Sequence, residues 1–237
     1  MWRATLVYAF VGLYVAILAP IGMLWSYFAG NTDFLFSLAR FCVRVAGWMC
    51  HVRVEVQGRD RIKPGQSYLF LSNHQGNLDG PVLFYATGRN LRAVIKKEMM
   101  KIPVFSAVLK KVNFVPIDRT DPMKTRPGID RAAQLLKDGY SFFAFPEGTR
   151  SRDGQLGEFK KGVFVMAIRA GVPVLPVSIR NSRAIQPPGR YGIKPGTVEL
   201  IFHDPLSTEN MRFEDRDHLL RLTRAAIAQG LSMGAEG

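Results

Sequence analysis

The chain has 237 residues, of which 47% are hydrophobic, enough to bury the core of one sizeable domain, so disorder is not the expectation. Lysine and arginine outnumber aspartate and glutamate by 32 to 19, which gives a net charge of +13. So basic a surface favours anionic partners such as phospholipid headgroups, nucleotides or nucleic acid, and it indicates a class of partner without indicating an activity.

The first expected element is a long apolar helix. Residues 4–29 carry no charge, and a helix of that length would measure about 39 Å, against about 30 Å for the hydrocarbon core of a bilayer. Pro20 and Gly22 interrupt the run, so the helix either spans the membrane with a kink or is broken into a shorter, partly immersed piece. A cleaved signal peptide is disfavoured, because the apolar region is long and its start carries a single basic residue, Arg3.

A second helix is expected over residues 34–50. Arg40 and Arg44 share one face of it, and its apolar surface comes from Phe36, Phe41, Val43, Val45 and Trp48. The alternative is a buried helical hairpin of a soluble protein, but so long an uncharged run is rare inside a small domain. We therefore predict that residues 1–50 form membrane-associated helices and that residues 51–237 form an α/β domain.

Cysteines and histidines give no sign of a metal site. Cys42 and Cys50 would lie about 12 Å apart along the second helix, so no disulfide is expected between them. Two cysteines in a chain of this size fit a reducing compartment that faces the cytosol. The four histidines are scattered, and neither a Cys-x-x-Cys nor a His-Glu-x-x-His pattern occurs; they are His51, His74, His203 and His218.

After Cys50, short apolar runs alternate with helical patterns, which predicts an α/β fold with a mostly parallel central sheet flanked by helices. The predicted strands are residues 52–56, 68–71, 93–95, 113–117, 141–145, 172–179 and 197–202. The predicted helices are residues 80–86, 103–111, 128–137 and 160–170. Ligands of such sheets gather at the carboxyl ends of the strands, and the polar stretches 72–80 and 146–151 both follow predicted strands there.

The first polar stretch contains His74 and Asp79. Five residues apart on one ideal helix, they would point about 140° apart, so a loop has to fold the histidine back over the aspartate. A carboxylate on Nδ1 would fix the imidazole tautomer and leave Nε2 to take a proton from a hydroxyl group. No Gly-x-Ser-x-Gly sequence supplies a serine nucleophile, so that hydroxyl could belong to the substrate. Taken alone, the pair fits a loop histidine bonded to a helix-capping aspartate equally well.

Three further blocks follow this pair in order along the chain. The four blocks are NHQGNLD at 73–79, NFVPIDR at 113–119, FPEGTRS at 145–151 and VPVLPVSI at 172–179. Together they resemble the four blocks of the glycerolipid acyltransferases, and most of all those of the bacterial lysophosphatidic acid acyltransferases, whose signatures include Asn-His-x-x-x-x-Asp and Phe-Pro-Glu-Gly-Thr-Arg. The resemblance extends from about residue 52 to about residue 179, and four ordered blocks are far more specific than any one of them.

The resemblance implies direct acyl transfer from acyl-CoA or acyl carrier protein to the free sn-2 hydroxyl of lysophosphatidic acid, without an acyl-enzyme intermediate and with no cofactor beyond that co-substrate. It implies that His74 is the general base and that Asp79 holds it in place. In the family the second and third blocks bind the acceptor. The candidate substrate-binding residues are therefore Arg119, Glu147, Gly148, Thr149 and Arg150.

The chemistry of these side chains refines the assignments. Arginine forks suit phosphate oxygens, and glycine at 148 lets the backbone approach a ligand closely. Glu147 would repel a phosphate, so we expect it to orient an arginine or the glycerol end of the acceptor. Lys96 matches a lysine often seen between the first two blocks and is a further candidate for a phosphate or donor contact, whereas Asp118 is expected to be structural.

Two of the blocks also predict strands of the sheet. Pro116 in the second block predicts an edge or bulged strand, and the fourth block predicts a core strand that shapes the site.

The predicted function is the synthesis of phosphatidic acid by a membrane-associated enzyme at the cytoplasmic face of the bacterial inner membrane. Its predicted partners are lysophosphatidic acid, an acyl thioester and membrane phospholipids, with acyl carrier protein as one possible donor. A sister activity with glycerol-3-phosphate or another lysophospholipid as acceptor remains open, because the blocks do not separate these acceptors. An alternative of another class is a non-catalytic basic protein that binds membranes or nucleic acid, but no RNA-binding signature occurs, so no nucleic-acid partner is predicted.

Overall fold

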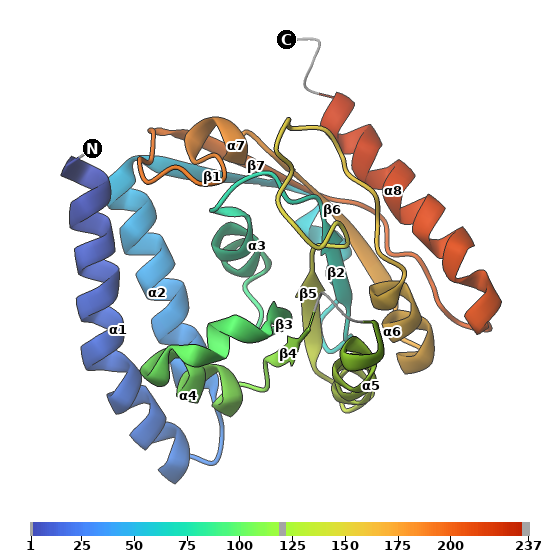
Figure 1. Cartoon of the computed structure of the whole chain (residues 1–237), viewed down its shortest axis with the longest axis horizontal. Coiled ribbons are helices and arrows are strands. Elements are labelled where there is room, and N and C mark those ends of the chain that lie inside the picture. Colours follow the sequence, from blue (N-terminus) through green and yellow to red (C-terminus); the bar gives the residue numbers. More distant parts are fainter. Residues whose placement is uncertain (1, 119–121, 234–237) are drawn as a thin grey trace.

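The computed structural model describes residues 2–118 and 122–233. A seven-stranded sheet with helices on both faces forms the body of the protein (Figure 1). The strands are β1 (Val52–Gln57), β2 (Leu69–Ser72), β3 (Leu91–Lys96), β4 (Val115–Ile117), β5 (Ser141–Ala144), β6 (Val174–Arg180) and β7 (Gly196–Phe202). The helices are α1 (Trp2–Phe28), α2 (Asp33–Cys50), α3 (Asp79–Thr87), α4 (Pro103–Lys111), α5 (Pro122–Lys137), α6 (Gly162–Ala170), α7 (Ser182–Ile185) and α8 (Arg216–Ser232). Short 3₁₀ turns cover Arg59–Arg61, Lys97–Lys101 and Phe213–Asp215.

The strand order is β1-β7-β6-β2-β5-β3-β4, and neighbouring strands are parallel except for β6 and β7. The predicted α/β class with a mostly parallel sheet is therefore confirmed. β2 lies between β5 and β6 and is buried along its whole length, as expected for a continuous apolar run covered on both faces. β4 is the last strand, so Pro116 lies on an edge strand as predicted.

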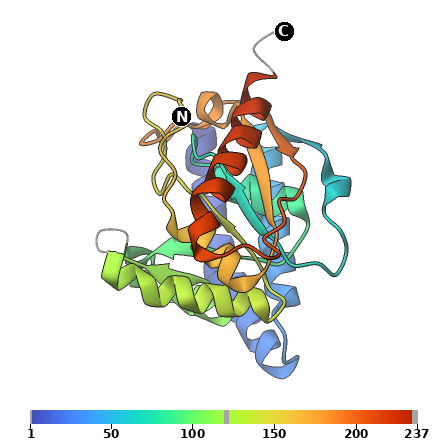
Figure 2. The ribbon, with the colours of Figure 1, turned by 90° about the vertical axis from the view of Figure 1, so that its right-hand side faces the viewer.

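Alternate side chains of β2 and of Tyr68, the residue before it, divide the core between the two faces of the sheet. Leu69 and Leu71 pack with the helices α5, α6 and α8, whereas Tyr68 and Phe70 pack with α3. Figure 2 shows α5, α6 and α8 together in front of the sheet. The parallel strands β2, β3, β4 and β5 end at the same edge, which therefore receives the loops that carry the first three sequence blocks.

The boundaries of several predicted elements need correction, and two helices were missed. β3 begins at Leu91, two residues before its predicted start, and α6 begins at Gly162, two residues after it. α5 begins at Pro122 and contains Pro127, whereas the predicted helix began at residue 128. Asn113 has a left-handed backbone (φ 60°), so β4 begins at Val115 rather than at Asn113. The fourth block forms β6 from Val174, two residues later than predicted. α8 and the short α7 were not predicted.

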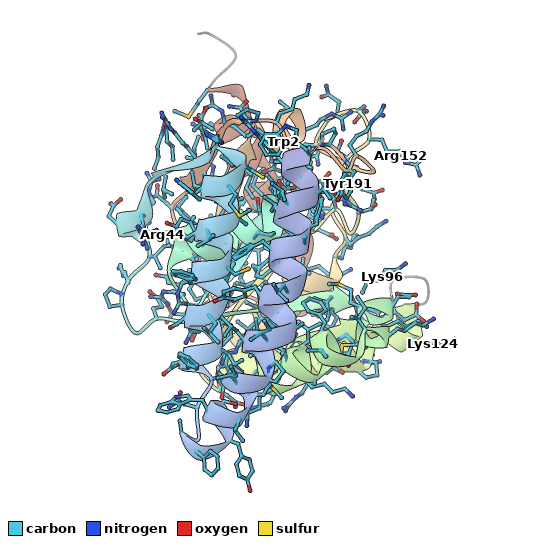
Figure 3. The ribbon with its side chains drawn as sticks, turned by 90° about the vertical axis from the view of Figure 1, so that its left-hand side faces the viewer. Trp2, Arg44, Lys96, Lys124, Arg152 and Tyr191 are labelled. Carbon is cyan, nitrogen blue, oxygen red and sulfur yellow. The ribbon has the colours of Figure 1, made fainter. Side chains whose placement is uncertain are left out.

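The first two helices lie side by side and cover one flank of the molecule (Figure 3). Among the described residues, α1 is the one helix that is long and apolar enough to cross a membrane. Only 11% of its most apolar 18-residue stretch is buried inside the protein. That exposure argues against the alternative of a buried hairpin, because a core helix of a soluble protein would be mostly covered. Trp48 and Phe41 of α2 are also exposed, whereas Phe36 of α2 is buried against the body of the protein. The two cysteines of α2 are free thiols, as expected.

Candidate active site

His74 and Asp79 meet at the carboxyl end of β2. The Nδ1 atom of His74 lies 2.7 Å from Oδ2 of Asp79, so the loop folds the histidine back onto the aspartate as predicted. Asp79 is fully buried at the first position of α3, while 19% of the His74 side chain is exposed. Because an ionised carboxylate accepts hydrogen bonds and cannot donate them, the neutral form of the ring carries its proton on Nδ1 and its lone pair on Nε2.

The backbone of the loop holds Asp79 in place. Its Oδ2 atom also accepts hydrogen bonds from the amides of Gln75, at 2.7 Å, and Gly76, at 2.8 Å. Asn73, just before the histidine, bridges to the end of β6, since its side chain accepts from the amide of Ile179 and donates to the carbonyl of the same residue, each at 2.8 Å. The base of the loop is therefore attached to two neighbouring strands.

The ring of His74 rests on the ring of Phe145, which follows β5. The two centroids are 3.9 Å apart and the planes are inclined by 11°. The aromatic face restricts the imidazole from one side while Asp79 fixes it at Nδ1. Phe145 opens the third block, FPEGTRS, so this block supports the histidine directly.

Glu147 requires a correction to its predicted task of orienting an arginine or the glycerol end of the acceptor. The carboxylate is buried, and its Oε1 accepts from the amide of His74 at 2.7 Å while Oε2 accepts from the amide of Gly157 at 2.9 Å. Burial raises the pKa of Glu147 above its ordinary value, and the two amide hydrogen bonds oppose that rise. Glu147 thus holds the His74 loop from behind, because a buried carboxylate needs donors and these two amides supply them.

The rest of the third block lies against the first. Ser151 donates its amide to the carbonyl of His74 at 2.8 Å, and a guanidinium nitrogen of Arg150 donates to Oδ1 of Asn77. Thr149 and Arg150 are exposed, and Gly148 adopts φ +73°, a left-handed turn that favours glycine. Among the predicted residues of the third block, Glu147 and Arg150 therefore contact the His74 loop, and Thr149 and Arg150 are open to solvent.

Residues 53–180 match the family model described as Acyltransferase, and this range is more than half of the 237 residues. The chain belongs to the acyltransferase family. The first and third blocks, whose contacts form the site, both lie inside the matched range.

Named relatives agree with the family. The acyltransferase is 36% identical over 156 residues to a chloroplastic 1-acyl-sn-glycerol-3-phosphate acyltransferase of Brassica napus, an alignment that covers 65% of this chain and 45% of the relative. It is 30% identical over 173 residues to a 1-acyl-sn-glycerol-3-phosphate acyltransferase of Pseudomonas aeruginosa, with 72% of this chain and 65% of that one covered. The chain thus spans about half the length of the plant relative.

A solved structure shares the fold. The crystal structure of the 1-acyl-sn-glycerophosphate acyltransferase PlsC from Thermotoga maritima superposes on this chain with a TM-score of 0.84. The superposition covers 100% of this chain and 97% of that chain, and the two sequences are 24% identical. This likeness extends to the N-terminal helices and supports the assignment of the α/β fold.

The second block and Lys96 of the acyltransferase contribute less to the geometry. Lys96 ends β3, two strands away from β2 at the same edge of the sheet, and its ammonium lies 3.7 Å from Glu98. Asp118 accepts a hydrogen bond from the Lys97 ammonium at 2.6 Å, in agreement with its expected structural role. Arg119 lies outside the described residues. Among residues 2–118 and 122–233, no cluster of three His, Cys, Asp or Glu side chains is arranged to hold a metal ion.

A large cavity begins beside the His74 loop. Its volume is about 1090 Å³, and Asn77 and Arg150 line it together with side chains of α1, α2, α3 and β1. Its walls are mostly apolar, and both cysteines, Cys42 and Cys50, face it. Tyr8 of α1 is also part of the wall and accepts a hydrogen bond from Gln186, so the first helix helps to enclose the space.

Several residues of the site were not predicted. Asn73 directly precedes His74 in the first block, and Phe145 is the first residue of the third block. Their places in these blocks were a signal from which both could have been found. Gly157 lies outside the blocks, and so does Arg224 on α8, whose guanidinium donates to the carbonyls of Leu156 and Gly157. No local pattern links residues that are 67 positions apart.

Proposed function

We propose that the acyltransferase moves an acyl group from acyl-CoA or acyl carrier protein to the sn-2 hydroxyl of lysophosphatidic acid and so makes phosphatidic acid. The observation that carries this proposal is the His74 ring, oriented through Nδ1 by buried Asp79 with Nε2 left as a proton acceptor. The printed names of the relatives, which are 1-acyl-sn-glycerol-3-phosphate acyltransferases, agree with this acceptor.

In the proposed reaction, Nε2 of His74 takes the proton of the acceptor hydroxyl as its oxygen attacks the thioester carbonyl carbon. Asp79 stabilises the imidazolium that forms. The tetrahedral intermediate then collapses, the carbon–sulfur bond breaks, and the imidazolium returns the proton to the departing thiolate. The products are an ester and a free thiol, and no bond to the protein is formed.

The cavity supports an acyl substrate. A space of about 1090 Å³ with mostly apolar walls is suited to a fatty chain, and its wall includes Asn77, three residues after His74. We propose that the acyl chain lies in this cavity, with the reacting carbonyl beside the His74 loop.

Exposed cations at the same edge suit the phosphate of the acceptor. Arg150 uses one guanidinium nitrogen on Asn77, and its remaining donors stay available for phosphate oxygens. Figure 3 shows Lys96 and Arg152 on the same side of α1. We propose that these cations face the anionic headgroups at the cytoplasmic side of the bacterial inner membrane, into which α1 inserts.

The test is an acceptor panel with purified protein in detergent and labelled acyl-CoA. Lysophosphatidic acid, glycerol-3-phosphate and lysophosphatidylcholine are each offered at equal concentration, and His74→Ala serves as the inactive control. We expect fast labelling of lysophosphatidic acid and slow labelling of the other two. Preference for another acceptor would overturn the substrate assignment, while equal transfer by His74→Ala would overturn the mechanism.

A further inference from the structure

Arg224 connects the C-terminal helix α8 to the loop behind the active site. Its guanidinium donates to the carbonyl of Gly157 and, at 2.9 Å, to the carbonyl of Leu156. The same group lies over the ring of Phe159, with 5.3 Å between its central carbon and the ring centroid. α8 lies outside residues 53–180, the range of the family match. A planar fork that binds two successive carbonyls fixes the direction of the peptide between them.

That same peptide is bonded to the catalytic loop through Glu147. The amide of Gly157 donates to Oε2 of Glu147 at 2.9 Å, and the amide of His74 donates to Oε1 at 2.7 Å. The approach at Gly157 is close, because a Cβ atom there would lie 2.9 Å from Oε2 of Glu147. An unbroken series of hydrogen bonds therefore runs from Arg224 through residue 157 and Glu147 to the backbone of His74.

We propose that Arg224 is a positioning residue for His74, acting through the peptide of Gly157 and the carboxylate of Glu147. The inference rests on the proposed role of His74 as the base. Arg224 does not touch the reacting atoms. It holds the Gly157 amide where Glu147 needs a donor, and the ionised carboxylate in turn holds the amide of His74.

The charge of Glu147 gives this series a signature in the pH dependence. His74 and Asp79 are the titratable groups that face Glu147. Burial and the charge of Asp79 raise the pKa of Glu147, while the amides of His74 and Gly157 and the charge of His74 lower it. If the Gly157 amide moves away, one of these lowering contacts is lost and the pKa of Glu147 rises. The carboxylate then takes up a proton at higher pH, so the acid limb of the kcat/KM profile moves to higher pH.

A merely structural role would have Arg224 attach α8 to the sheet. α8 already has other attachments, since Leu219, Thr223 and Ile227 are buried and Ser178 of β6 donates to the carbonyl of Ile227 at 2.8 Å. Loss of Arg224 should therefore leave α8 in place, and its effect should pass through Glu147.

The experiment is a double-mutant cycle on the purified full chain with Arg224→Met, Glu147→Gln and both together. Arg221→Met, an exposed arginine one turn earlier on α8, is the matched control. We expect Arg224→Met to lower kcat about tenfold, equal to about 1.4 kcal/mol, to raise the pH of the acid limb, and to add little to Glu147→Gln. Arg224→Lys should recover part of the loss, and Arg221→Met should behave as the wild type.

Hydrogen exchange of residues 152–160 provides a readout that needs no activity. Faster exchange there in Arg224→Met, with α8 still protected, is the expected result. Additive effects of Arg224→Met and Glu147→Gln, or an unmoved acid limb, would overturn the inference. A fully active His74→Ala variant would overturn the proposed mechanism instead, and the coupling between positions 224 and 147 would remain measurable.

Discussion

The imidazole of His74 lies almost parallel to the ring of Phe145, with the centroids 3.9 Å apart. The contact joins the first and third blocks at the point where the proposed chemistry takes place. A ring held on one face by an aromatic side chain and at Nδ1 by a carboxylate has little freedom to turn away from the substrate. This arrangement leads to specific expectations for variants of the site.

Phe145→Leu should lower kcat roughly 2- to 10-fold, because ring stacking contributes about 0.5–1.5 kcal/mol and leucine offers no flat face. KM for acyl-CoA should change little. Phe143→Leu, the same replacement on β5 at a residue that contacts Phe145 edge-on, is the control and should leave kcat nearly unchanged. Steady-state kinetics of both variants check this, and an equal loss in both would contradict a specific role of the stacked ring.

Asp79→Asn should lower kcat by about 10²- to 10⁴-fold, because a neutral amide does not stabilise the imidazolium and no longer dictates which ring nitrogen carries the proton. Substrate binding should persist. The measurement pairs single-turnover acyl transfer with equilibrium binding of a non-hydrolysable acyl-CoA analogue. A variant within threefold of the wild-type rate would show that Asp79 is structural only.

Gly157→Ala should slow acyl transfer, because the new methyl group would lie 2.9 Å from Oε2 of Glu147 and push the carboxylate off the His74 amide. Gly192→Ala is the matched control, since no atom lies within 4 Å of the methyl group added there. Rates and melting temperatures of the two variants are compared. Wild-type activity in Gly157→Ala would show that the Glu147 contacts do not affect the rate.

The two cysteines allow the proposed acyl cavity to be tested by chemical labelling of the native protein, with a cysteine-free variant as control. Cys42 and Cys50 both line it, and burial raises the pKa of both thiols, so alkyl methanethiosulfonates are applied at alkaline pH. A long alkyl adduct should block transfer from long-chain donors, while a methyl adduct should not. The variant with both cysteines replaced by serine should resist the reagents. Complete labelling by the long reagent with full activity would place the chain elsewhere.

His203 should make the stability of the protein depend on pH. Burial lowers the pKa of this side chain below its ordinary value of 6.5, aided by the charge of Arg61 and opposed by Asp204. The unfolded chain therefore binds a proton more readily than the folded one, and the free energy of unfolding should fall as pH drops below about 6.5. In His203→Gln, which keeps a donor for Ser178, the melting temperature should fall less between pH 7 and about pH 5. Parallel curves for the two proteins would contradict this assignment.

The features of the fold and of the site that could be predicted from the sequence are those that depend on local patterns. The apolar run at residues 68–71 predicts the strand that becomes β2, and the spacing of His74 and Asp79 predicts a loop that folds back. Both are present because each depends on residues that are neighbours in the chain. The apolar residues Leu219, Leu220 and Ile227 of α8 were a usable helical signal that was overlooked.

What could not be predicted depends on distant parts of the chain. The partners of Glu147 are backbone amides, and a bond to a backbone group has no residue type that would reveal it. Arg224 meets its partners from a helix 67 residues farther along the chain. The cavity beside the site forms between α1, α2, α3 and β1, whose packing is not encoded in any single segment. The role of Arg119 stays a prediction.

The central claim is that His74 removes the proton of the acceptor hydroxyl. The most direct measurement is the single-turnover rate of acyl transfer to lysophosphatidic acid by purified His74→Ala, with acyl-CoA binding measured in the same sample. We predict a rate about 10²- to 10⁴-fold below wild type, with unchanged binding and an unchanged melting profile. A His74→Ala variant that transfers the acyl group at the wild-type rate would contradict the account.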